Sequence, residues 1–234
     1  DRYPLFAAKS ERAGADAPWA LVTGGVHGYE TSGVQGALAF LAEHAEPYLS
    51  RINLLVAPCV SPWGYEVIHR WNPRAIDPNR SFTANSPAEE SAALMQLVGD
   101  SGARFLVHLD LHETTDSDNT EFRPARAARD GISQSTWNIP DGFYLGARSD
   151  RPTPAFQAAI RDRVAQVTRH QPRVGVFDTH VGTGGAGASL IHTIAYKGDL
   201  ATTVTQRIQC CSDMLCSIGR VKRQKAWQPR SEGP

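Results

Sequence analysis

Residues 19–44 read WALVTGGVHGYETSGVQGALAFLAEH, and this stretch decides the fold. It begins with a short apolar run, residues 19–23, that favours a β-strand and stops at two glycines. From Ser32 to His44, apolar residues recur every three or four positions, which is the spacing of an amphipathic helix. The stretch therefore predicts a strand, a glycine-rich turn and a helix.

The same alternation of strands and helices continues along the chain. Residues 52–57 (INLLVA) form a near-continuous apolar run, as expected for a strand that is covered on both faces. Residues 105–111 (FLVHLDL) predict a third strand. Residues 87–98 and 154–170 carry apolar side chains at helical spacing. This order predicts an α/β fold with a mixed, mostly parallel twisted sheet and helices on both faces.

The length and the residue composition of the chain predict one catalytic domain. A chain of 234 residues with 41% hydrophobic content can bury one core, and we assign this domain to residues 1–206. Residues 207–234 form a separate segment, because they are basic and hold three of the four cysteines. Residues 61–86 and 112–153 are rich in Pro, Asn, Asp, Gly and Ser, so we expect two long functional loops there.

The charge of the chain argues against two classes of partner. Lys plus Arg and Asp plus Glu both number 24, so no overall field would attract nucleic acid or an anionic membrane surface. No run approaches the roughly 18 apolar residues of a membrane helix, and the N-terminus lacks the layout of a signal peptide. We therefore expect a soluble, cytoplasmic protein that binds neither nucleic acid nor membranes.

The turn GGVHGYE places His27 and Glu30 directly after the first strand. Ligands bind at the carboxyl ends of strands in open α/β sheets, and an imidazole and a carboxylate on such a turn can hold one cation. The pattern H-x-x-E is common by chance, and an ordinary histidine followed by a helix-capping glutamate would look the same. A second ligand segment is needed.

Residues 108–113 (HLDLHE) supply that segment. His108, Asp110 and His112 alternate along a strand and so point to one side of it. His112 lies where the strand ends, which makes it the better third ligand. We expect Asp110 to orient a ligand and His108 to be a buried core histidine.

Residues 61–82 read SPWGYEVIHRWNPRAIDPNRSF and carry a family resemblance. The stretch resembles the zinc metallocarboxypeptidases of the carboxypeptidase A-like family. In that family an N-P-D-G-Y-E-like turn is followed by R-x-N-x-x-G-x-D-L-N-R-x-F. The matching positions are Pro62, Gly64, Tyr65, Glu66, Arg70, Asn72, Asp77, Asn79, Arg80 and Phe82.

The resemblance implies a role for several of these residues. It implies that one zinc ion is bound by His27, Glu30 and His112. Arg70 would be the catalytic arginine that polarises the scissile carbonyl and stabilises the oxyanion. Asn79 and Arg80 would bind the terminal carboxylate of a peptide, and a planar guanidinium suits a carboxylate in two hydrogen bonds.

The run DLHET also resembles the succinylglutamate desuccinylase and aspartoacylase branch, whose members cleave an amide of a small acyl amino acid. We therefore expect a zinc metallocarboxypeptidase that hydrolyses the C-terminal peptide bond of a substrate with a free carboxylate, through a zinc-activated water. The alternatives are a zinc amidohydrolase of N-acyl amino acids and a catalytically silent domain that binds zinc and carboxylates. A second metal near Asp110 or Glu113 is a further possibility.

The general base departs from the family pattern. The family carries a catalytic glutamate near the end of a late strand, whereas residues 200–206 (LATTVTQ) end in Gln206, and an amide cannot act as a base. Glu121 is our first candidate for a general base in place of the missing glutamate, and Glu113 is the second. The family also closes a tyrosine over the substrate; Tyr144 is our candidate and Tyr196 the alternative.

Overall fold

The structure is a computed structural model of the chain that describes residues 3–115, 117–135, 142–147, 153–166, 173–174 and 190–197. The strands of these residues form one seven-stranded sheet in the order β1-β3-β2-β4-β7-β5-β6. Strands β3, β2, β4 and β7 run parallel, while β1 and β5 pair antiparallel with β3 and β7. The strands are β1 Ala8–Ser10, β2 Trp19–Gly24, β3 Asn53–Ala57, β4 Phe105–Glu113, β5 Gly142–Ala147, β6 Arg173–Val174 and β7 Leu190–Lys197.

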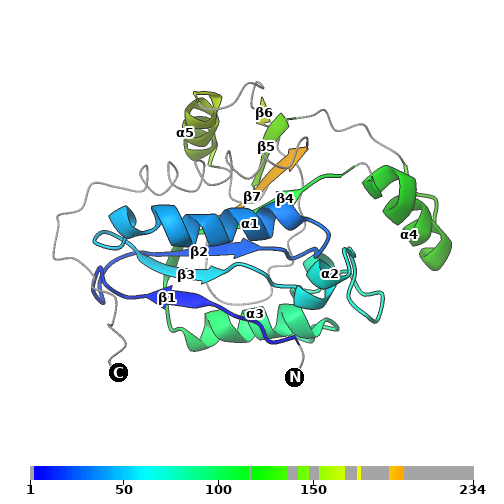
Figure 1. Cartoon of the computed structure of the whole chain (residues 1–234), viewed down its shortest axis with the longest axis horizontal. Helices are drawn as coiled ribbons and strands as arrows, with labels where there is room; N and C mark the ends of the chain where they lie inside the picture. The colour runs from blue at the N-terminus through cyan, green and yellow to red at the C-terminus, as the bar shows by residue number, and fades with distance from the viewer. Residues whose placement is uncertain are drawn as a thin grey trace, which may run out of the picture.

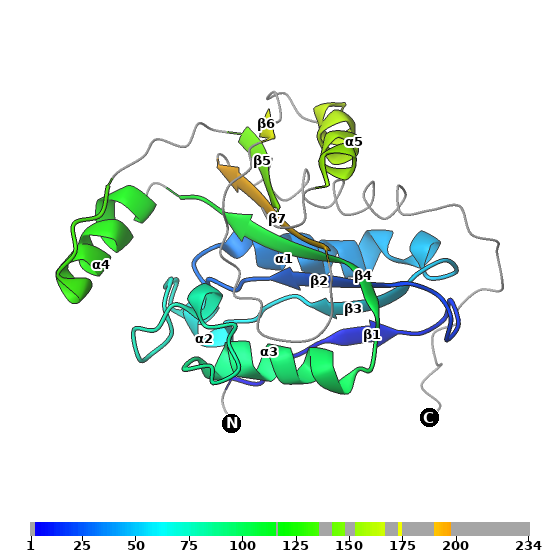
Figure 2. The same cartoon turned by 180° about the vertical axis from the view of Figure 1, so that it is seen from behind.

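Helices cover both faces of this sheet, with α1 and α3 on opposite sides of the central strands (Figures 1 and 2). A π-helical turn, η1 (Phe40–His44), continues α1. Two further one-turn elements, η3 and η4, are important for the site. The helices are α1 Thr31–Ala39, α2 Pro62–Glu66, η3 Pro78–Arg80, α3 Glu89–Asp100, η4 Asp118–Phe122, α4 Arg123–Asp130 and α5 Pro154–Ala165, with a further turn, η2, at Glu46–Tyr48.

Strand β2 shows why its sequence is apolar throughout. Ala20 and Val22 belong to the core that includes Phe40 of η1, whereas Leu21 packs on the other face in a cluster with Leu97 of α3. Successive side chains of a strand point to opposite faces, so a strand between two helical layers is apolar at most positions on both faces. The continuous run of residues 19–23 thus reflects burial on both sides.

The predicted α/β fold with a mixed, mostly parallel sheet is confirmed. The strands and helices expected from residues 19–57 and 87–111 are all present, and α5 is described up to Ala165. The expectation of two long loops was wrong in part, because α2 and η3 lie within residues 61–86 and η4, α4 and β5 lie within residues 112–153. Helix α4 (RPARAARD) has no buried residue, and its only apolar residues are three alanines and a proline, so no large apolar side chains at helical spacing could have revealed it.

Several predictions fall on residues outside the described part of the chain. These include residues 200–206 with Gln206 and the segment 207–234. Strand β7 and the short strands β1, β5 and β6 were not expected from the sequence. In the described part of the chain, no helix combines the length and the apolarity that crossing a membrane requires.

Candidate metal centre and substrate site

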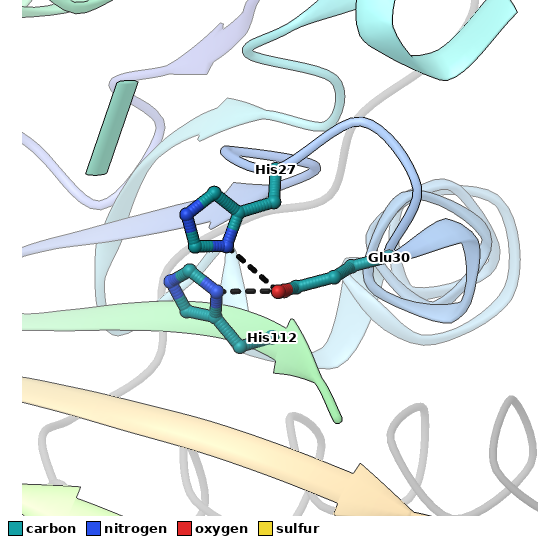
Figure 3. Close-up of side chains that lie close together, drawn as sticks. All are labelled: His27, Glu30 and His112. Carbon is teal, nitrogen blue, oxygen red and sulfur yellow. Dashed lines mark hydrogen bonds and ion pairs between the residues drawn. The ribbon is translucent and has the colours of Figure 1, made fainter. Parts of the chain in front are cut away.

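The three predicted ligands converge at the carboxyl ends of β2 and β4. Gly24, the last residue of β2, pairs with Leu111 of β4, so the turn that follows β2 lies beside His112. The ligand atoms of His27, Glu30 and His112 all lie within 4.8 Å of one another, and the three side chains are buried (Figure 3). We call these three residues the metal-binding triad.

Glu30 lies between the two imidazoles of the triad. Nδ1 of His27 is 2.7 Å from Oε1 of Glu30, and Nδ1 of His112 is 2.7 Å from Oε2 (Figure 3). The backbone N–H of Glu113 also donates to Oε2, at 2.9 Å. The two Nδ1 atoms and the carboxylate therefore face a common point, as the ligands of one cation must.

Each imidazole is fixed from behind by a second carboxylate. Nε2 of His27 lies 2.9 Å from Oδ1 of Asp77, and Nε2 of His112 lies 2.7 Å from Oδ2 of Asp110. Thr23 donates its hydroxyl hydrogen to Oδ1 of Asp110 at 2.6 Å. A carboxylate on one ring nitrogen holds the proton there and leaves the other nitrogen free for a metal. Asp110 thus contacts the ligand that it was expected to orient.

The electrostatics of the triad favour a positive charge at its centre. Burial by itself would lower the pKa of His112, but Asp110 and Glu30 raise it to about 10. Burial would raise the pKa of Glu30, yet His112 and His27 hold it well below its usual range. A buried anionic cluster that retains a proton so strongly is also suited to a divalent cation, which would replace that proton.

The predicted catalytic arginine lies beside the triad. Nη1 of Arg70 is 4.0 Å from Oε1 of Glu30, and its Nε is 3.5 Å from Oδ2 of Asp77. Nη1 donates to the hydroxyl of Tyr29 at 2.9 Å and to Oδ1 of Asp118 at 3.0 Å. Sequence reasoning missed Tyr29 and Asp118. Tyr29 stands within HGYE, next to a ligand, which was the one available signal.

Asn79 and Arg80 lie on the short turn η3, and Asp77 joins this turn to the metal site. Asp77 accepts a hydrogen bond from the backbone N–H of Asn79 at 3.0 Å with the same Oδ1 that contacts His27. Asn79 is buried, and its Oδ1 has no hydrogen-bond partner among the described residues. Arg80 is exposed, and its guanidinium makes no hydrogen bond or ion pair with the described part of the chain, although its backbone N–H donates to the carbonyl of Asp77. Both side chains keep polar groups available for a ligand.

The remaining predicted residues are not brought into the triad. Glu121 is exposed on η4 and is not part of the His27, Glu30 and His112 group. Glu113 accepts the backbone N–H of Ser32, at 3.1 Å, with its carboxylate, which places it at the start of α1. Tyr144 lies in β5, opposite Ala195 of β7, and not in a loop. Glu121 and Tyr144 therefore stay predictions.

Solved metallopeptidase structures share this fold. A candidate metallopeptidase from Shewanella amazonensis SB2B superimposes with a TM-score of 0.66 at 21% identity, covering 91% of this chain and 82% of that one. The product-bound cell shape determinant Csd4 from Helicobacter pylori gives 0.67 at 14% identity, over 95% and 57%. A metallo-carboxypeptidase from Burkholderia cenocepacia gives 0.64 at 13% identity, over 92% and 61%.

The chain thus has the fold of structures named as a metallopeptidase and a metallo-carboxypeptidase, which confirms the carboxypeptidase-like fold that the sequence resemblance implied. Residues 19–222 match the sequence profile of a family described as "Protein of unknown function (DUF2817)", and the chain belongs to this family. A search of curated proteins found no match to the sequence.

Proposed function

We propose that this protein is a zinc-dependent metallocarboxypeptidase that hydrolyses the C-terminal peptide bond of a peptide. The observation that carries the proposal is the convergence of the buried metal-binding triad within 4.8 Å, with Arg70 at its edge. A cation-binding cluster and a nearby guanidinium are two of the parts that a metal-dependent hydrolase uses to stabilise the charge that develops on the substrate.

The triad fits zinc as its metal. Two imidazole nitrogens and one carboxylate form a donor set that catalytic zinc sites use, with a position left for water. The carboxylates of Asp77 and Asp110 on the far nitrogens are the outer contacts typical of such sites. When bound, zinc supplies Lewis acidity and lowers the pKa of water.

The protein's own side chains would bind and orient the substrate. Arg70 would donate to the carbonyl oxygen as negative charge develops on it, and it is already charged and held in place. The guanidinium of Arg80 and the side-chain NH2 group of Asn79 would bind the terminal carboxylate of the peptide, since both are hydrogen-bond donors and an ionised carboxylate is an acceptor. This arrangement favours substrates with a free carboxylate at the bond's C-terminal side.

Proton transfer and closure over the substrate need two further residues. We assign the proton transfer to Glu121, the exposed carboxylate on η4, whose first residue, Asp118, contacts Arg70. We assign substrate binding, by closure over the bound peptide, to Tyr144. A peptide is favoured over an acyl amino acid by the fold's similarity to Csd4, whose structures include a tripeptide-bound form.

Metal content measured by elemental analysis tests the proposal first. We expect about one zinc per chain in the purified protein and a loss of this zinc in His112→Ala. His44→Ala is the matched control, because His44 is partly exposed and its only ion pair within the described residues is with the neighbouring Glu43, at 3.8 Å. A parent protein that binds no zinc even after incubation with the metal would overturn the proposal. Turnover of carboxylate-ended peptides against N-acyl amino acids then decides the substrate.

A further inference from the structure

We infer that Tyr29 and Asp118 are positioning residues that hold the guanidinium of Arg70 beside the metal-binding triad. The inference rests on the proposed function, in which Arg70 stabilises the charge that develops on the substrate. It adds two residues, from segments far apart in sequence, whose role neither motif of the chain indicates.

The three side chains form a closed triangle of hydrogen bonds. Nη1 of Arg70 donates to Oη of Tyr29 at 2.9 Å and to Oδ1 of Asp118 at 3.0 Å. The Tyr29 hydroxyl donates in turn to the same Oδ1 at 2.8 Å. Each group fixes the other two, and charged donors and acceptors make the stronger hydrogen bonds. The guanidinium is therefore held in one orientation.

Asp118 also opposes an attraction that would disturb the metal site. Glu30 is a buried carboxylate, and its Oε1 lies 4.0 Å from Nη1 of Arg70, against 3.0 Å for Oδ1 of Asp118. Without Asp118, the carboxylates left near the guanidinium would be those of Asp77 and Glu30, and its Nη1 would be drawn toward Glu30, because a buried charge is costly unless it is paired. A direct Arg70–Glu30 pair would occupy the carboxylate that the metal needs. Asp118 thus keeps the guanidinium of Arg70 near the triad without letting it pair directly with Glu30.

The backbone brings Arg70 close but does not fix its side chain. The N–H of Tyr29 donates to the carbonyl of His69 at 3.2 Å, which joins the ligand turn to the residue before Arg70. Ile68 has a φ of 53°, a left-handed conformation that is costly for a β-branched residue. Such strain persists where surrounding contacts impose the conformation. The arginine side chain is long, so the position of its guanidinium still depends on the hydrogen bonds to Tyr29 and Asp118.

The segment that carries Asp118 is anchored to the site by an aromatic cluster. Phe122, at the end of η4, packs on Tyr29 with ring centroids 4.8 Å apart and on Trp71 at 5.9 Å. The guanidinium of Arg129, in α4, lies 4.9 Å from the centroid of the Trp71 ring. Helix α4 lies at the same end of the molecule as α2 in both views (Figures 1 and 2). Asp118 is therefore presented to Arg70 from a docked segment.

The restricted motion of the Arg70 guanidinium can be measured directly by NMR of the full chain labelled with 15N-arginine. The Arg70 signals are identified as those missing from Arg70→Lys. We expect restricted, slowly exchanging Nη protons in the parent protein, and merged signals in Asp118→Asn and in Tyr29→Phe. The matched controls are Asp130→Asn, on the same segment but paired with Arg129, and Tyr65→Phe, whose hydroxyl contacts Gln35. Parent-like Arg70 signals in Asp118→Asn would overturn the inference.

Peptide turnover by the zinc-loaded variants gives the second measurement. A misplaced catalytic group costs up to about a hundredfold, so we expect kcat to fall roughly 10- to 100-fold in Asp118→Asn with KM changed less than about twofold. In an Arg70→Lys background, Asp118→Asn should cost little more, because the two act as one unit. Unchanged kcat in a folded, zinc-loaded Asp118→Asn would sink the inference. A parent that cleaves no peptide would instead refute the proposed function, while the NMR comparison still decides whether Asp118 holds Arg70.

Discussion

Asp110 lies directly behind His112, with its Oδ2 2.7 Å from Nε2 of the imidazole, so that His112 presents Nδ1 to Glu30. Both residues belong to β4 and are two positions apart, which places their side chains on one face of the strand. The local geometry of the strand thus builds a ligand and its support together.

Replacing Asp110 by Asn should weaken zinc binding. The amide keeps the shape of the side chain but loses the charge that makes the imidazole a better ligand, and the loss of such an outer contact costs about 10- to 100-fold in metal affinity. Competition with a chromogenic chelator measures the affinity. Asp100→Asn, at the exposed end of α3, is the control and should bind zinc like the parent. Equal affinities for all three proteins would contradict this role.

Replacing Arg80 by Ala should raise KM for a peptide with a free C-terminus. A hydrogen bond between charged partners contributes about 1.5–3 kcal/mol, so a rise of roughly tenfold or more is expected. The same peptide with an amidated C-terminus should be turned over equally by the parent and the variant. Arg51→Ala serves as the control, because Arg51 lies over the ring of Tyr48 at 5.5 Å. A KM effect of equal size on both peptides would refute carboxylate binding by Arg80.

Gly28 should not tolerate a side chain. A Cβ at this position would lie 2.0 Å from the backbone carbon of Gly64, which α2 presses against the ligand turn. We expect Gly28→Ala to lower the free energy of unfolding by about 1–3 kcal/mol. It should also weaken metal binding, because Gly28 lies between the ligands His27 and Glu30 in sequence. Thermal or urea unfolding measures the first effect.

Gly99→Ala is the matched control for Gly28→Ala. Nothing lies within 4 Å of a Cβ at Gly99, which belongs to helix α3. Alanine there should stabilise the protein by about 0.4–1 kcal/mol, because it restricts the unfolded chain and favours the helix. Equal effects of the two substitutions would show that the close approach of Gly28 and Gly64 is not a constraint.

Cys59 should react slowly with alkylating agents. Burial disfavours its thiolate and raises its pKa to about 11. Because the thiolate is the reactive form, alkylation by iodoacetamide at pH 8 should be on the order of a hundredfold slower in the folded than in the denatured protein. Mass spectrometry of the Cys59 peptide follows the reaction. A similar rate in both states would contradict the burial of this thiol.

The same shift predicts a loss of stability at high pH. The folded pKa of Cys59 lies above the unfolded value of about 8.5, so the folded state keeps a proton that the unfolded chain releases. The contribution is complete below about pH 8.5 and is lost as the pH rises toward 11. Between about pH 8.5 and 11, the free energy of unfolding, measured with urea, should therefore fall less steeply in Cys59→Ala than in the parent. Equal slopes in the two proteins would contradict this prediction.

Much of the fold could be predicted because its central strands are buried on both faces. Residues 19–23, 52–57 and 105–111 are mostly apolar runs, and each corresponds to a strand of the parallel part of the sheet. Helix α4 was not predicted, since it buries no residue and its sequence offers alanine and proline but no large apolar side chain. The short edge strand β1 pairs with β3 through backbone hydrogen bonds, which place little demand on side-chain type.

The sequence by itself determined the ligands of the candidate metal site. His27 and Glu30 follow one strand and His112 ends another, and parallel strands bring such positions together at one edge of the sheet. Only the tertiary structure decided how Arg70 is held. Asp118 is 48 positions from Arg70, and their contact exists because the segment after β4 folds back over the ligand turn and docks Phe122 on Tyr29. No local pattern encodes such a contact, since it depends on where two loops meet in space.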